Sequence, residues 1–198
     1  MIENITQILI TKEKETIPPL IESAIKSVKD SFPDFSYTLY DNEKIIETIR
    51  AGIGEEALRA YMKIKPYANK ASFARYCIIY LKGGWYLDVT IKLLTGINLS
   101  GEVDFLGFRD LGEGLRPNTL PYSMQNSFFY SKSKSKILEN AINLVIENCR
   151  NEYYGVTPVS TTGPGVLGRS LAIEGMKSTH VIGLFMPLTP NHQLKNPS

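Results

Sequence analysis

The sequence predicts an α/β domain of three layers, built around a largely parallel β-sheet. Short runs rich in β-branched and aromatic residues alternate with amphipathic stretches of helical period, as they do where crossover helices join parallel strands. The chain has 198 residues, of which 43% are hydrophobic and 21% charged, which suffices for one well-packed core and is short for two. We therefore expect one domain over residues 1–186 and a tail without a core pattern over 187–198, whether the native chain ends there or continues.

The first part of the chain contains two predicted strands and three predicted helices. Pro18-Pro19 favours a helix start because proline fits the first helical turn, and Gly52 and Gly54 mark the turn between the second and third helices. Asn42 is expected to cap the second helix. In chain order, the expected elements are a strand over 5–11, a helix from 18 that stops at 32–34, a strand over 36–40, and helices over 42–50 and 55–63.

The next predicted helix buries a charge. Residues 73–81 are apolar or aromatic except for Arg75, and this guanidinium needs a partner because an unpaired charge is costly to remove from water. If a helix over 68–82 ends at Gly83-Gly84, the chain rises roughly 12 Å from Arg75 to the glycines at about 1.5 Å per residue.

A strand over 85–89 would bring Asp88 back to the level of Arg75, because it descends about 13 Å at ~3.3 Å per residue. We therefore predict that Arg75 and Asp88 share one pocket at the carboxyl end of the strand. The pair either serves a phosphorylated ligand and a divalent metal, approached closely through the Gly-Gly turn, or only fixes the helix on the strand. Trp85 and Tyr86 alternate along the strand, so one is expected in the core and the other at the pocket rim, where its ring either meets a sugar or base or, by default, packs into the core as well.

The remaining part combines strands, one amphipathic helix and a long loop. Residues 111–124 are rich in glycine, proline and polar residues without an apolar period, which indicates a mobile loop that closes over a ligand. The segment Thr161-Thr162-Gly163-Pro164-Gly165 is typical of a helix start with a threonine N-cap, either a plain capped helix or one whose amides receive a ligand. The other expected elements are strands over 91–94, 103–108, 126–130 and 181–186 and a helix over 135–150.

The order of residues from Arg75 through Gly83-Gly84, Tyr86 and Leu87 to Asp88 resembles the sugar-binding region of DXD-type glycosyltransferases of family 32. This family includes fungal initiating mannosyltransferases, bacterial capsular polysaccharide transferases and, more distantly, glucosylating clostridial toxins. Weaker similarity extends over most of the chain from the first strand to the last. The resemblance implies a GT-A-type, nucleotide-sugar-binding fold with a mainly parallel, mixed sheet.

The activity that the resemblance implies is transfer of a hexose from a nucleotide-diphosphate sugar to a saccharide or lipid-linked saccharide acceptor, as in polysaccharide biosynthesis. It also implies retaining chemistry assisted by Mn²⁺ or Mg²⁺. The sequence offers no well-placed general base, because Glu139 and Glu147 fall on the polar face of a helix. Residue by residue, the resemblance assigns catalysis to Asp88 and Arg75; donor binding to Gln7, Ser72, Arg75, Gly83, Gly84, Asp88 and Thr90; the sugar and acceptor loop to Asn126, Thr162, Gly163, Pro164 and Gly165; and metal binding to Asp88, with Thr90 and His192 as weaker ligands.

Three positions depart from the family pattern. Ser72 and Thr90 stand where the family has aspartates, Thr90 in place of the second aspartate of the DXD motif, and Thr6 replaces a histidine of the first strand. A hydroxyl holds a hard cation less well than a carboxylate, so a rival reading is a nucleotide-sugar-binding module with little or no catalysis. A nucleotidyltransferase is a further rival, but the chain has no GxxxxGK[ST] sequence and no glycine-rich phosphate loop after its first strand.

Composition narrows the partners. A net charge of +2, with both signs interspersed, gives little support to nucleic-acid binding. Lys132, Lys134 and Lys136 form a small basic stripe, either a solvated loop or a surface for peripheral contact with acidic lipid or glycan. Cys77 and Cys149 fall in apolar helical stretches and are expected to stay reduced. Because no stretch approaches the ~18 apolar residues of a membrane span and none is typical of a signal peptide, we expect a cytoplasmic protein.

Overall fold

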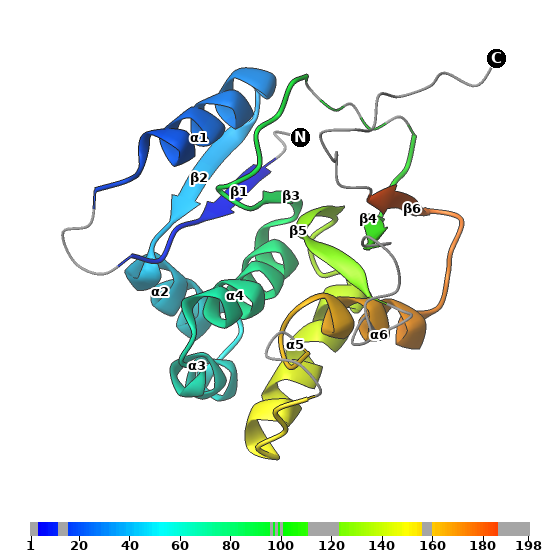
Figure 1. The fold of residues 1–198 in the computed structure, drawn as a ribbon. Coiled ribbons are helices and arrows are strands. Elements are labelled where there is room, and N and C mark those ends of the chain that lie inside the picture. Colours follow the sequence, from blue (N-terminus) through cyan, green and yellow to red (C-terminus); the bar gives the residue numbers. More distant parts are fainter. Residues whose placement is uncertain are drawn as a thin grey trace.

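The computed structural model describes residues 4–11, 16–95, 97, 99, 101–110, 123–155 and 160–185 of the chain (Figure 1). The described residues form one sheet of six strands in the order β2-β1-β3-β5-β4-β6. The strands are β1 (Asn4–Ile8), β2 (Ser36–Tyr40), β3 (Gly84–Leu87), β4 (Phe105–Asp110), β5 (Met124–Ser131) and β6 (His180–Phe185).

All strands of this sheet except β5 run in the same direction. β1 pairs in parallel with β2 and β3, and β4 pairs in parallel with β6, whereas β5 is antiparallel to both of its neighbours, β3 and β4. The last residues of the parallel strands therefore lie together with the first residues of β5, at what we call the carboxyl end of the sheet. The opposite side is its amino end. The predicted mainly parallel, mixed sheet is confirmed.

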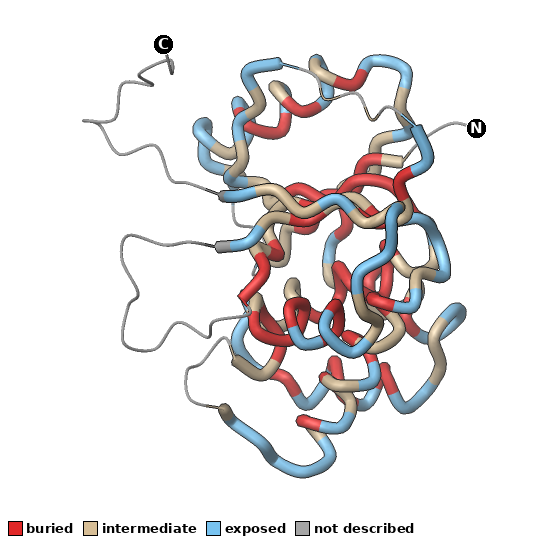
Figure 2. The backbone as a smooth tube through the Cα atoms, turned by 90° about the vertical axis from the view of Figure 1, so that its right-hand side faces the viewer, coloured by how far each residue is buried: buried red, intermediate tan, exposed pale blue. Residues whose placement is uncertain are grey.

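Helices cover both faces of the sheet, which makes it the middle of three layers (Figure 1). The larger core cluster joins α2 to α6 with one face, where Tyr86, Phe105 and Phe129 lie, and the smaller cluster joins α1 with the other face through Val28 and Trp85. Buried residues accordingly follow the sheet and the inward sides of the helices (Figure 2). The helices are α1 (Pro19–Ser31), α2 (Asn42–Gly52), α3 (Glu55–Lys63), α4 (Tyr67–Lys82), α5 (Lys136–Arg150) and α6 (Pro164–Glu174).

Connectivity brings three helix termini to the carboxyl end of the sheet. α4 leads through Gly83 directly into β3, so its first turns lie at the carboxyl end and its last turn at the amino end. α5 follows β5 from the amino end and runs back, and α6 then returns toward the start of β6 (Figure 1). The start of α4, the end of α5 and the start of α6 are therefore neighbours of the strand ends where ligands bind in α/β sheets.

Several predicted boundaries are corrected by hydrogen bonds. The strand predicted over 85–89 ends at Leu87, because the amide of Ile91 donates to the carbonyl of Asp88 at 2.9 Å and closes a turn. The first strand ends at Ile8, where its partner β2 also ends, and residues 91–94 form no strand. The cap of α2 is Asp41, not Asn42: the Asp41 carboxylate accepts the amide of Lys44 at 2.9 Å, as N-cap side chains do.

Gly83 and Gly84 serve the packing of the backbone at the amino end of the sheet. Both have positive φ, +67° and +99°, which side-chain-bearing residues rarely adopt. A Cβ on Gly84 would lie 2.2 Å from the carbonyl oxygen of Asn4 in β1. The predicted close approach therefore exists, but its partner is another part of the chain. The two glycines lie at the opposite end of β3 from Asp88.

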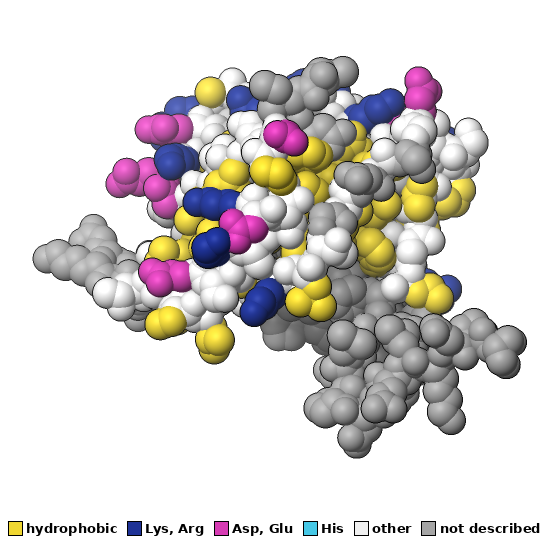
Figure 3. All heavy atoms as spheres, turned by 90° about the horizontal axis from the view of Figure 1, so that it is seen from above, with side chains coloured by type: hydrophobic (Ala, Val, Ile, Leu, Met, Phe, Trp, Pro, Cys, Tyr) yellow, Lys and Arg dark blue, Asp and Glu magenta, His cyan; other side chains and the backbone are white. Residues whose placement is uncertain are grey.

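Charges are dispersed over the described surface. Acidic and basic side chains are interspersed on the face seen in Figure 3. The three stripe lysines each have a partner: Lys132 pairs with Asp104 at 2.8 Å, Lys134 lies over the ring of Tyr80, and Lys136 pairs with a glutamate of α5. These contacts favour the solvated-loop reading of the stripe over a lipid-binding surface. Within the described residues, no helix has the length and apolar character needed to cross a membrane.

Candidate functional site

The predicted ion pair between Arg75 and Asp88 is confirmed. Nη1 of Arg75 lies 3.1 Å from Oδ1 of Asp88, and the arginine side chain is only 5% exposed while the aspartate is 32% exposed. Asp88 follows the last residue of β3, so the pair lies at the carboxyl end of the sheet. The guanidinium is thus on the protein side and the carboxylate on the solvent side of the pair.

Arg75 also donates to two backbone carbonyls. Nε donates to the carbonyl of Ala71 at 3.1 Å and Nη1 to the carbonyl of Asn126 at 2.5 Å. Burial lowers the pKa of the guanidinium, but Tyr86, Asp88 and Tyr76 raise it by more, so the group stays charged. One planar group therefore joins α4, β3 and β5 beneath the strand ends, a geometry that arginine supplies and lysine does not.

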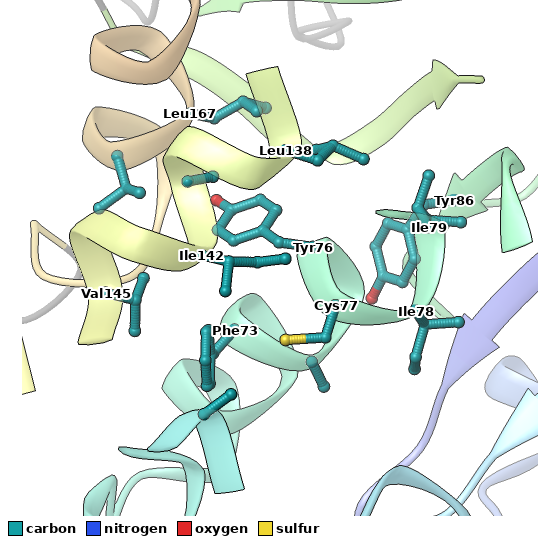
Figure 4. Packing of buried hydrophobic residues seen from close by; sticks show 14 of the residues in the cluster. Phe73, Tyr76, Cys77, Ile78, Ile79, Tyr86, Leu138, Ile142, Val145 and Leu167 are labelled. Carbon is teal, nitrogen blue, oxygen red and sulfur yellow. The ribbon is translucent and has the colours of Figure 1, made fainter. Parts of the chain in front are cut away.

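Tyr86 orients the carboxylate of Asp88. Its hydroxyl donates to Oδ1 of Asp88 at 2.6 Å, and its ring lies 4.4 Å from the guanidinium carbon of Arg75. Burial raises the pKa of Tyr86 well above its usual value, so the proton stays on the hydroxyl. Figure 4 shows the Tyr86 ring beside α4. The expectation that one of Trp85 and Tyr86 lines the rim is wrong: both are fully buried, and Trp85 stacks on Phe128 at the other face.

Gln7 binds the backbone of Asp88 from the buried side. Its Nε2 donates to the Asp88 carbonyl at 3.3 Å, and its Oε1 accepts the hydroxyl of Tyr37 at 2.9 Å. Burial raises the pKa of Tyr37 to about 12, which keeps this donor protonated. Gln7 is fully buried, so it acts on the site through Asp88 rather than through a surface of its own. Sequence reasoning missed Tyr37, because nothing local marks a tyrosine in a half-buried strand as a second partner.

A second hydrogen-bond chain links Asn126 to the start of α6. The Asn126 amide donates to Ser72 at 3.3 Å and to the hydroxyl of Tyr76 at 3.1 Å, and Tyr76 donates to the carbonyl of Gly163 at 3.1 Å. Burial raises the pKa of Tyr76, which therefore remains a donor. Figure 4 shows Tyr76 reaching from α4 toward α5. Sequence reasoning missed Tyr76; its spacing of four residues from Ser72, on the same helical face, was an available signal.

The glycine-proline loop starts α6 without a side-chain cap. Gly163 is the N-cap and Pro164 stands in the first turn, so the predicted threonine cap is wrong. Gly165 is buried inside the helix. Thr162 is instead 2% exposed, and its hydroxyl has no hydrogen-bond partner among the described residues. The loop belongs to the site through Gly163, which accepts from Tyr76.

The described residues offer few metal ligands. No three His, Cys, Asp or Glu side chains gather into a metal-binding group within the part of the chain that the structure describes. Asp88 offers one carboxylate, and Thr90 is exposed in the turn after β3. His180 starts β6 at the amino end of the sheet, far from Asp88. His192, the tail over 187–198 and residues 111–122 of the predicted loop lie outside the described residues.

Comparison with known proteins agrees with this arrangement. Residues 18–106, which include Arg75 and Asp88, match the family described as glycosyltransferase sugar-binding region containing DXD motif. An uncharacterized glycosyltransferase of Acanthamoeba polyphaga mimivirus is 32% identical over 107 residues, which cover 54% of this chain and 41% of the relative. The chain thus spans about two fifths of the length of that relative.

Among solved structures, the chain is similar to the PaToxG glycosyltransferase. The TM-score is 0.69 at 16% sequence identity, and the match covers 87% of this chain and 69% of that one. At this identity the likeness shows the fold, which is of the GT-A type expected from the sequence.

Proposed function

We propose that this chain, whose residues 18–106 match the family described as glycosyltransferase sugar-binding region containing DXD motif, transfers a hexose from a nucleotide-diphosphate sugar to a saccharide or lipid-linked saccharide acceptor. The observation that carries the proposal is the buried Arg75 held against a partly exposed Asp88 at the carboxyl end of the sheet. A donor bound there would meet a fixed carboxylate at the strand end, in the position where open α/β sheets receive nucleotides.

The residues of the pair and those around it would have different roles in donor binding and transfer. Asp88 would contact the donor on its exposed side, either directly or through a cation. Arg75 would hold Asp88 in place and add positive charge beneath the departing diphosphate, which lowers the barrier when a leaving group gains negative charge. Tyr86 and Gln7 would fix the carboxylate and the backbone of Asp88, so that little rearrangement is needed at the moment of transfer.

The proposed transfer retains the configuration of the sugar. The bond between the anomeric carbon and the diphosphate oxygen breaks, the acceptor oxygen bonds to the same carbon from the same face, and the acceptor proton passes to the departing diphosphate. This route needs no carboxylate base. The absence of a base from this route agrees with the positions of the two glutamates of α5: Glu139 pairs with Lys136, and Glu147 is exposed.

Asp88 and Thr90 would hold a divalent cation that is shared with the donor. One oxygen of Asp88 already lies against Arg75 and Tyr86, and Thr90 adds only a neutral hydroxyl, so the protein alone offers few strong ligands. Oxygens of the diphosphate would complete the set. When bound, Mn²⁺ or Mg²⁺ would neutralise the leaving diphosphate.

Replacing Thr90 by aspartate is expected to tighten Mn²⁺ binding without nucleotide by roughly tenfold or more, because the number of charged ligands sets the affinity for hard cations. Thr90 is exposed, so the new carboxylate stays in water and the melting temperature should not change. Calorimetric titration of Mn²⁺ and thermal melts measure both quantities. The matched control is Thr95→Asp, at another exposed threonine. Equal tightening in both variants would rule out Thr90 as a ligand.

The proposed function is tested with a panel of uridine, guanosine, adenosine and deoxythymidine diphosphate sugars, with and without Mn²⁺. A donor that binds the folded protein raises its melting temperature by mass action, and mass spectrometry of the products then detects the released diphosphate and the transferred hexose. Absence of any stabilisation across the panel would contradict the proposal. Stabilisation without turnover would favour the binding-module alternative, which the hydroxyls of Ser72 and Thr90 at two acidic family positions support.

A further inference from the structure

A cavity of about 700 Å³ lies beside the start of α4, separate from the ion pair. Its walls come from the α3–α4 junction, from the end of α5 with the residues after it, and from the threonines that precede α6. The volume is in the range of pockets that enclose small ligands. Arg75 and Asp88 are not among the lining residues.

The cavity opens at the same end of the sheet as Asp88. The start of α4, the end of α5 and the start of α6 all lie at the carboxyl end, as the connectivity of these helices with β3, β5 and β6 requires. Contacts across the cavity wall agree with this placement: Lys63 of α3 donates to the carbonyl of Cys149 at 2.8 Å, and Asn148 donates to the carbonyl of Thr161 at 3.0 Å. Cavity and ion pair are thus neighbours on the helical side of the strand ends.

One face of α4 joins the cavity to the ion pair. Asn69 lines the cavity, and Ser72 and Tyr76 follow it at helical spacings of three and seven residues, which place the three on one face. Ser72 and Tyr76 both bind the amide of Asn126, whose carbonyl accepts from Arg75. One end of a ligand in the cavity would therefore point along the row formed by Asn69, Ser72 and Tyr76, toward the place where the donor diphosphate leaves.

The lining suits sugar rings. Tyr153 and Tyr154 present exposed phenol rings, Asn69 and Asn148 contribute amides, and most of the wall is apolar. The ammonium group of Lys63 is already engaged by Glu152 at 3.2 Å and by a backbone carbonyl. Lys65 also lines the cavity at its exposed edge. Flat aromatic faces with a few polar groups match a saccharide, which has an apolar ring face and a rim of hydroxyls.

We propose that this cavity is the subsite for the saccharide acceptor, and that it holds uncharged sugar rings between the two tyrosines and the start of α4. The proposal rests on the proposed transferase function. The cavity also joins a part of the chain inside the family match, residues 63–69, to a part outside it, residues 148–155 with 161 and 162. The acceptor wall therefore lies partly outside the matched region, whereas the donor pair lies entirely within it.

Cys149 provides a direct readout of occupancy. It lines the cavity and is half-buried, whereas Cys77, the other cysteine of the chain, is fully buried. Alkylation of Cys149 by iodoacetamide, followed by peptide mass spectrometry at fixed pH, is expected to slow at least threefold with one or more of methyl glucoside, methyl galactoside, methyl mannoside, N-acetylglucosamine, maltose and lactose. Mannitol, a polyol without a ring, should have no effect at the same concentration.

Tyr154→Ala should raise the sugar concentration that gives half-protection roughly tenfold. Its side chain is 76% exposed, so the melting temperature should stay unchanged. The control is Tyr67→Ala, which removes a tyrosine that is 47% exposed on the first turn of α4 and does not line the cavity. Unslowed alkylation with every sugar, or equal protection in wild type and Tyr154→Ala, would overturn the proposal.

Donor measurements keep the two proposals separable. Tyr154→Ala is expected to leave donor stabilisation unchanged and to raise the KM for the saccharide acceptor about tenfold at constant kcat. If nucleotide sugars bind and turn over while the cysteine readout fails, only the acceptor subsite is refuted. If sugars protect Cys149 but no nucleotide sugar binds, the saccharide site stands and the transferase function fails.

Discussion

Replacing Arg75 by lysine is expected to abolish detectable donor binding and to lower the free energy of unfolding by about 3 kcal/mol. An ammonium group cannot reach Asp88 and the carbonyls of Ala71 and Asn126 together, so one or two charge-assisted hydrogen bonds, each worth ~1.5–3 kcal/mol, are lost. The contact of the planar guanidinium with the Tyr86 ring is lost as well. Urea unfolding and calorimetry with the best donor of the panel measure the two effects.

The matched control for this substitution is Arg50→Lys. Arg50 lies in the last turn of α2 with its side chain 58% exposed and a 4.0 Å contact to Glu55, so its replacement should change stability by less than ~0.5 kcal/mol. Unchanged donor affinity in the Arg75→Lys protein would mean that the arginine only fixes α4 on β3. A partial loss of stability with normal affinity would support the same structural role.

Asp88→Asn is expected to reduce transfer by roughly 10²–10³-fold, the usual cost of removing one preorganised electrostatic group from an active site. The amide has nearly the same shape and can still accept from Tyr86, but it has no charge to offer a cation or to balance Arg75. Because the carboxylate is 32% exposed, the loss of stability should be smaller than for Arg75→Lys. Steady-state rates of diphosphate release, with a thermal melt of each protein, measure both.

Asp104→Asn is the control for Asp88→Asn. Asp104 is also a partly exposed, ion-paired aspartate, bound to Lys132 at 2.8 Å and to the hydroxyl of Thr179 at 2.6 Å, but it lies before β4 at the amino end of the sheet. Its replacement should leave transfer unchanged. If Asp88→Asn keeps full activity, or if both variants lose activity equally, Asp88 has no specific part in the chemistry.

The sequence by itself determined the α/β class, most element boundaries and the meeting of Arg75 with Asp88. This pairing was predictable because one helix, one turn and one strand separate the two residues, and the rise per residue of each element is fixed by backbone hydrogen bonding. A charge in an apolar helix needs an anion, and Asp88 was the acidic residue at the matching level. Local rules sufficed because the whole argument spans 14 residues, from 75 to 88.

Tertiary structure alone decided the partners that come from distant parts of the chain. The backbone that Gly84 approaches closely is that of Asn4, about 80 residues away in the chain. Gln7 donates to the carbonyl of Asp88 and accepts from Tyr37. The cavity beside α4 has walls from segments about 80 residues apart, which no local pattern relates. A buried polar group needs a hydrogen-bond partner, and the packing of the helices on the sheet decides which partner is within reach.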